Sequence, residues 1–111
     1  MANNYKVLGQ AAAAAATDTL LYTVPANTQT IGSSVAAANR DPAVTAAYRV
    51  AVVPSADSLN TKHYLRYDKL LAPRDDNQMV IGISLAAGDK VYVRSDTGNV
   101  SFSLFGNEIT P

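Results

Sequence analysis

The chain of 111 residues contains no cysteine and no tryptophan, and it has one histidine and one glutamate. Without cysteine it cannot form a disulfide framework, and a single histidine supplies too few nitrogen ligands for a zinc site of the usual kind. Acid–base and nucleophilic catalysis need a base, its partner and a nucleophile held together by recognisable motifs, and no such motif is present. The sequence therefore predicts a protein that is not an enzyme and needs no metal or other cofactor.

Charge is also scarce. Charged residues make up 16% of the chain, against about 25% in typical soluble domains. Nine basic residues balance nine acidic ones, so the net charge is zero, which argues against nucleic acid and an anionic membrane as partners. A neutral surface with few charges protects a monomer poorly against association. We therefore expect a homo-oligomer, either a dimer or a trimer.

What the sequence does contain is a series of short segments in which Val, Ile, Leu and Tyr alternate with smaller or polar residues. These segments extend from Thr19 to Ile109, with Pro, Asn, Asp and Gly between them. This pattern predicts an all-β protein, an antiparallel β-sandwich. The expected strands are residues 19–24, 30–39, 46–53, 63–71, 78–85, 90–94 and 99–109.

Alternation also predicts which side of a strand is buried. In residues 46–53 the face that carries Tyr48 is the expected core face, because Arg49 interrupts the other one. In residues 63–71 the expected core face carries Leu65, Tyr67 and Leu71.

The first 18 residues differ from the rest and are expected to form an extended N-terminal arm, followed by a β-sandwich domain over residues 19–111. Six consecutive alanines, residues 11–16, form too short a run for a stable isolated helix or a membrane span. Two interpretations remain: a flexible linker, or an arm that orders on a neighbouring subunit through Tyr5, Val7 and Leu8. In either case, deletion of residues 1–16 is expected to leave the β domain folded.

Two groups of residues could carry chemistry or contacts. His63 could act with Asp68, Ser55 or Ser58 in a small hydrolase, but no motif connects them, so a structural histidine is favoured. Tyrosines and arginines lie together on the predicted strands, as at protein interfaces, in cores and on sugar-binding faces. Without tryptophan an interface or core role is favoured, and the expected contact residues are Tyr5, Val7, Leu8, Tyr48, Tyr64 and Tyr67.

Six stretches of the chain together resemble a family of small virion structural proteins of tailed bacteriophages, especially phages of cyanobacteria. The resemblance covers about residues 19–110, and it is a likeness of the whole chain rather than a match to a catalytic signature. The stretches are Leu20–Ile31, Asn39–Arg40, Tyr48–Val52, Lys62–Asp68, Gly88–Ser95 and Phe102–Ile109.

The resemblance implies a compact, jelly-roll-like β-sandwich that assembles on the virus particle. The implied function is that of a capsid decoration (cement) protein, which binds the outer capsid surface and stabilises contacts between major capsid subunits. The implied partners are the major capsid protein and further copies of this chain. The implied location is the outer surface of the virion, after synthesis in the host cytoplasm. The alternative is a tail, baseplate or fibre appendage that contacts the host surface. The family brings no catalytic residues to transfer.

Overall fold

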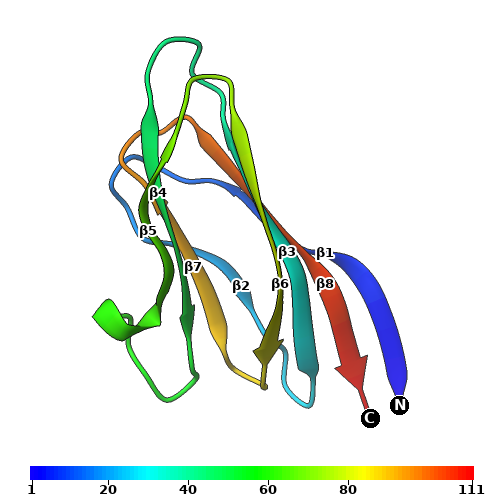
Figure 1. The fold of residues 1–111 in the computed structure, drawn as a ribbon. Coiled ribbons are helices and arrows are strands. Elements are labelled where there is room, and N and C mark those ends of the chain that lie inside the picture. Colours follow the sequence, from blue (N-terminus) through cyan, green and yellow to red (C-terminus); the bar gives the residue numbers. More distant parts are fainter.

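The computed structural model describes all 111 residues, apart from the side chain of Ile81. Eight strands and one short 3-10 turn, η1, account for most of the chain (Figure 1). No helix in the described residues is long and apolar enough to cross a membrane. The elements are β1 (Ala2–Ala12), β2 (Thr19–Thr23), β3 (Gln29–Asn39), β4 (Ala46–Val53), η1 (Thr61–His63), β5 (Tyr64–Leu71), β6 (Asp76–Leu85), β7 (Lys90–Ser95) and β8 (Val100–Thr110).

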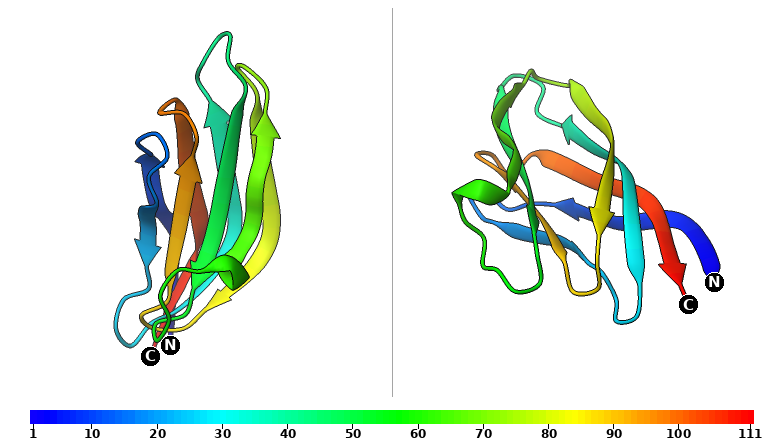
Figure 2. Two further views of the ribbon diagram at one scale, coloured as in Figure 1. Left: turned by 90° about the vertical axis from the view of Figure 1, so that its left-hand side faces the viewer. Right: turned by 60° about the horizontal axis from the view of Figure 1, so that its bottom comes forward.

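The strands form two four-stranded sheets. Sheet A has the order β1-β8-β3-β6, and sheet B has the order β2-β7-β4-β5. All pairings between these strands are antiparallel, and β1 pairs with β8, β2 with β7, β3 with β6, and β4 with β5. The chain thus pairs like one long hairpin that is rolled into two layers, and both termini lie side by side (Figure 2). The prediction of an all-β antiparallel sandwich is confirmed.

The core lies between the sheets, where each strand places alternate side chains. Val100, Phe102 and Leu104 of β8 are at most 1% exposed, and Val91 and Val93 of β7 face them from sheet B. Because the apolar residues recur at every second position, the inward faces form one continuous apolar cluster. The outward faces carry polar residues together with several exposed apolar ones, such as Val80 and Leu70.

Sequence alternation predicts the core face of β4 correctly but fails for β5. Tyr48 is buried, whereas Leu65 and Tyr67 are 39% and 58% exposed, and only Leu71 of the expected face is buried. The register of β5 against β4 shifts beside Arg49, and Asp68 has a positive φ of 52°. This irregularity reverses the side on which the following residues point, as a bulge does.

The extended N-terminal arm is not confirmed. Residues 2–12 form β1, which pairs with β8 of the same chain over its whole length. Leu8 and Ala11 pack against the core, and Ala13 is 1% exposed. The sequence signal for this strand is weak because alanine is depleted in strands, and because its partner strand lies about a hundred residues away in the chain.

Candidate functional site

The six predicted contact residues lie in three different places. Tyr5 and Val7 point outward from sheet A and are 78% and 47% exposed. Tyr64 and Tyr67 lie on the outside of sheet B, on β5. Leu8 packs against the core. Four of the six residues are thus accessible, two on each outer face of the sandwich.

Tyr48 does not lie on either surface, so its predicted role as a contact anchor is wrong. It is 2% exposed, and its ring lies 6.0 Å from that of Phe102 across the two sheets. Burial raises the pKa of the Tyr48 hydroxyl, with a smaller opposing effect from Arg66. The alternation of β4 already identifies this face as the core face, and the contact prediction conflicted with it.

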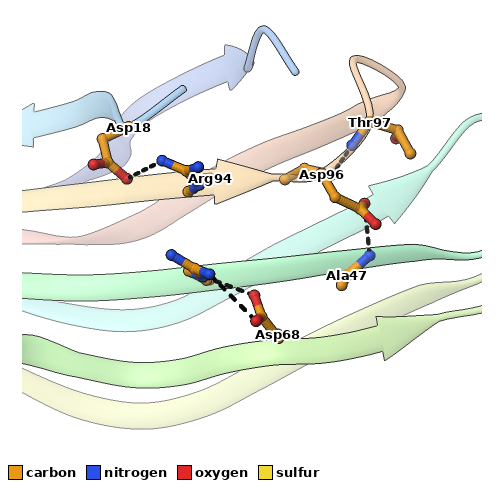
Figure 3. A network of polar contacts seen from close by, with 8 residues as sticks. Asp18, Ala47, Asp68, Arg94, Asp96 and Thr97 are labelled. Atoms are coloured by element: carbon orange, nitrogen blue, oxygen red, sulfur yellow. Dashed lines mark hydrogen bonds and ion pairs between the residues drawn. The ribbon is translucent and has the colours of Figure 1, made fainter. Parts of the chain in front are cut away.

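The outside of sheet B carries a row of opposite charges (Figure 3). Arg49 of β4 and Arg94 of β7 are directly opposite each other in the sheet, where two like charges destabilise the pairing. Each arginine has its own acidic partner: the Arg49 Nε lies 2.7 Å from the Asp68 Oδ1, and the Arg94 Nη1 lies 3.4 Å from the Asp18 Oδ1. The result is an acid–base–base–acid row across the sheet.

Aromatic rings extend this row at the β5 edge. The Arg49 guanidinium carbon lies 4.1 Å from the centroid of the Tyr67 ring, within the range of a cation–π interaction. The Tyr64 and Tyr67 rings meet edge to face, with their centroids 4.9 Å apart. The hydrogen bond between Arg49 and Asp68 lowers the pKa of the Asp68 carboxyl below its usual value. It also raises the pKa of the Arg49 guanidinium above the usual value for arginine. The pair therefore stays charged across the physiological range.

A hollow of about 260 Å³ lies beside these residues and is lined by Arg49, Asp68, Leu70, Arg94 and Asp96, among others. Asp96 is fixed in place because its Oδ1 accepts a hydrogen bond of 2.9 Å from the Ala47 backbone N–H. The lining combines charges of both signs with an apolar side chain. Such a surface can bind a polar partner through complementary charges.

The only histidine of the chain has a structural place in the β4–β5 connection. His63 is 6% exposed, and its Nδ1 accepts the Asn60 backbone N–H at 3.0 Å. Because a backbone N–H can only donate, Nδ1 carries no proton, and Nε2 donates to the Asp57 Oδ2 at 3.1 Å. The hydrogen bond from His63 is the main cause that lowers the pKa of Asp57. Both ring nitrogens of His63 thus have hydrogen-bond partners within the β4–β5 connection.

A polar cluster that the sequence does not reveal lies between the sheets and is centred on Glu108. Its carboxylate accepts a hydrogen bond from the Tyr22 hydroxyl and forms an ion pair of 3.0 Å with the Lys6 Nζ. The Tyr22 hydroxyl also lies 2.9 Å from the Thr30 Oγ1. Burial, followed by the bond to Glu108, raises the pKa of Tyr22 to about 12. No local motif identifies this cluster, because its residues come from four strands.

Among the described side chains, no three His, Cys, Asp or Glu residues come together as a metal site would require. The described residues form two accessible outer faces and an internal polar cluster that joins strands.

No protein-family model and no curated protein sequence matches the chain. Among solved structures, a chain in the structure of infectious bursal disease virus Gx strain is similar, with a TM-score of 0.54 and 11% identity. A chain of the T13 particle of the same virus is similar with a TM-score of 0.51 and 11% identity. At these identities the likeness establishes a shared fold. It covers 96% of this chain in both cases, but only 31% and 30% of the viral chains, so this chain spans less than a third of their length.

A third similar structure is a pentameric capsid protein isolated from metagenomic phage sequences. Its TM-score is 0.43 at 16% identity, and the aligned region covers 94% of this chain and 64% of that chain. A TM-score below 0.5 does not establish a shared fold.

Proposed function

We propose that this chain is a virion structural protein, and specifically a capsid decoration (cement) protein of a tailed bacteriophage. The observation that carries the proposal is the fold, which extends over almost the whole chain and is shared with a segment of a viral particle protein. The strand orders β1-β8-β3-β6 and β2-β7-β4-β5 have the rolled pairing of a jelly roll, an architecture that recurs in viral capsid domains. The resemblance of residues 19–110 to small phage virion proteins supports the same role.

In this role the chain binds the outside of the assembled shell and bridges neighbouring major capsid subunits. A protein that binds only the assembled shell stabilises it by mass action. Many copies on a symmetric surface add their weak contacts together. This mechanism needs contact surfaces and no catalysis, and it places the protein on the outer surface of the virion after synthesis in the host cytoplasm.

The outside of sheet B is the surface that we assign to the shell. Tyr67 is 58% exposed and held from one side by Arg49 and from another by Tyr64. A rigid, exposed aromatic residue with an arginine is the usual composition of an interface anchor. Tyr67→Ala should therefore reduce the occupancy of the protein on purified particles. Val44→Ala, which truncates a 50% exposed residue of the β3–β4 loop, is the matched control.

An enzymatic alternative would depend on His63. Its two ring nitrogens are committed to the Asn60 backbone and to Asp57, so neither is available to activate a serine or a water molecule. This arrangement supports a non-catalytic function.

The second candidate is a tail, baseplate or fibre appendage that contacts the host surface. The hollow on sheet B favours it, because Asp68, Arg94 and Asp96 line it with hydrogen-bonding groups. Arg49, which also lines it, lies against the Tyr67 ring. Polar groups next to an aromatic ring can also hold a surface glycan.

The copy number of this chain per purified virion, measured by quantitative mass spectrometry against the major capsid protein, tests the proposal. A copy number similar to that of the shell protein is expected for a decoration protein. A far lower number would favour the tail or fibre alternative. Absence of the chain from the particle would overturn the structural role altogether.

A further inference from the structure

The outer face of sheet A differs from that of sheet B because its described side chains form a nearly uncharged surface with an apolar centre. Among these described side chains, Asp76 at the start of β6 is the one that carries a charge. Lys6 and Glu108 of the same sheet pair with each other on its inner side. The charges of the molecule are thus concentrated away from this face.

The apolar residues of this face lie next to each other in the sheet register. One row across the four strands consists of Val7, Phe105, Ser34 and Val80. The next row consists of Tyr5, Asn107, Ile31 and Ser84. Adjacent strands are about 4.8 Å apart, and residues on one face of a strand repeat about every 6.6 Å. The apolar side chains of the two rows therefore form one patch, which we call the sheet A patch: Tyr5, Val7, Ile31, Val80 and Phe105.

Every residue of the sheet A patch is accessible. Val80 is 73% exposed and Tyr5 is 78% exposed, while Val7, Ile31 and Phe105 are between 37% and 47% exposed. Serine, asparagine and glutamine residues surround the patch on the same strands. An apolar centre with an uncharged polar rim is the composition of a protein–protein interface. A patch of this kind on a soluble domain indicates an interaction site.

We infer that the outer face of sheet A is a self-association surface on which a second copy of this chain docks face to face, about a two-fold axis. Two observations select a second copy as the occupant. The first is charge: apart from Asp76 at the start of β6, the described side chains of this face are uncharged, so a second copy docked on its centre brings no like charges together there and leaves no partner charge without a counter-ion.

The second observation is size. Four strands of up to eleven residues offer a face of about 700 Å² at the usual strand spacing and rise. A stable interface of standard size buries about 800 Å² on each partner. In the second row the larger side chains of Tyr5 and Ile31 alternate with the smaller ones of Asn107 and Ser84, and two packed sheets need such differences in size for their side chains to interdigitate. The inference goes beyond the proposed function, because it concerns the purified chain whether or not that chain belongs to a virion.

The experiment compares the oligomeric state of three purified proteins by analytical ultracentrifugation over a wide concentration range. The wild type should be a dimer. Val80→Lys should raise the dissociation constant of the dimer by at least about 100-fold, because a desolvated charge without a partner costs several kcal/mol. Leu70→Lys is the matched control, since Leu70 is 72% exposed on an edge strand of sheet B. It should leave the dimer unchanged.

Unfolding of Val80→Lys is checked by circular dichroism. If this variant does not fold, Tyr5→Lys takes its place, because it introduces the same charge on a different strand of the sheet A patch. Since the chain has no cysteine, a single introduced cysteine also gives a clean position for a spin label. A label at position 80 should become immobilised as the dimer forms, and a label at position 70 should remain mobile.

The inference is overturned if the wild type stays monomeric at the highest concentration, or if it forms a trimer or pentamer without a two-fold contact. It is also overturned if Leu70→Lys dissociates the dimer while folded Val80→Lys or Tyr5→Lys does not. Capture of a different protein on this face by a wild type that does not self-associate would assign the patch to that partner. None of these results depends on the copy number in the virion.

Discussion

Glu108, the only glutamate of the chain, connects residues of three other strands. Its carboxylate lies on β8 and binds Lys6 of β1 and Tyr22 of β2, and Tyr22 in turn contacts Thr30 of β3. Three of these residues belong to sheet A and one to sheet B, so the cluster joins the two layers. A buried carboxylate costs free energy unless it is paired and hydrogen-bonded, and here both oxygens have partners.

Glu108→Gln should lower the free energy of unfolding at neutral pH by about 1–3 kcal/mol, because the ion pair with Lys6 is lost and the charged hydrogen bond from Tyr22 becomes a neutral one. Urea unfolding followed by circular dichroism measures the change. Asp76→Asn removes an acidic charge from an exposed position and should change the stability by less than about 0.5 kcal/mol. Equal losses in the two variants would contradict this account of Glu108.

The same carboxylate predicts a dependence on pH. The hydrogen bond from Tyr22 is the main cause that holds the pKa of Glu108 below its ordinary value of 4.5. Folding therefore favours the ionised form, and the stabilisation is complete above pH 4.5 and lost as the pH falls through the lowered pKa. The difference in unfolding free energy between the wild type and Glu108→Gln should shrink in this acidic range. A difference that stays constant down to the lowest pH at which both proteins fold would show that ionisation of Glu108 is not the cause.

At the scale of elements, β1 depends on one close approach to β2. The register of β1 shifts between Val7 and Gly9. A Cβ atom at Gly9 would lie against the backbone carbonyl of Leu21, far inside normal contact distance. The bulge thus brings the backbone of an edge strand of sheet A directly onto sheet B, which only glycine permits.

Gly9→Ala should destabilise the protein by more than about 1 kcal/mol, because backbone atoms must move apart to admit the methyl group. Gly82→Ala is the matched control: its Cβ would meet nothing within 4 Å. The control should be neutral or slightly stabilising, because alanine restricts the unfolded chain. Thermal unfolding of both variants measures the difference, and equal melting temperatures would refute the close approach.

Deletion of residues 1–12 should also destabilise the sandwich, contrary to the expectation from the sequence that the β domain stays folded when residues 1–16 are deleted. Without β1, the edge of β8 loses its hydrogen-bonding partner, and Leu8 no longer covers the core. An uncovered edge strand promotes aggregation. We expect a lower melting temperature and a lower yield of soluble refolded protein. An unchanged melting temperature would show that β1 is an accessory strand.

At the scale of the whole molecule, the two outer faces differ in chemistry. Salt should therefore affect the contacts made by one face differently from those made by the other. The sheet A patch is uncharged, whereas sheet B presents Arg49, Arg94, Asp18 and Asp68. Salt screens exposed charges but leaves apolar contacts intact, and sulfate strengthens them.

The dimer formed through sheet A should therefore resist sodium chloride and become tighter in sodium sulfate. Attachment to the shell through sheet B should weaken as sodium chloride rises. Sedimentation of the purified chain measures the first effect, and release of the protein from particles measures the second. Dissociation of the purified dimer by sodium chloride would indicate that its interface is the charged face of sheet B.

The sequence predicts much of this fold because the strands and the core follow from alternation alone. The predicted strands at 46–53 and 78–85 correspond to β4 and β6, and the Tyr48 face is the core face. The prediction for β5 fails because a bulge at Asp68 reverses the side of the sheet on which the following side chains lie. A sequence pattern with a period of two cannot anticipate such an inserted residue.

The candidate surfaces were predictable only in part. Tyr5, Val7, Tyr64 and Tyr67 are accessible as expected, but they lie on opposite sides of the sandwich. Ile31, Val80 and Phe105 belong to the same patch because their strands pair with one another, although these strands are far apart in the chain. The sequence alone does not specify that pairing.

The sequence by itself determined the class of the fold, the positions of most strands, the neutral charge and the lack of the reactive residues that catalysis commonly uses. These properties depend on composition and on local alternation. Only the tertiary structure decided that residues 2–12 form the edge strand β1, that Glu108 binds Lys6 of β1 and Tyr22 of β2, and that Arg49 pairs with Asp68 on the outside of sheet B. The physical reason is that each of these features arises from contacts between distant segments, and the register of those contacts is set by packing of the two sheets.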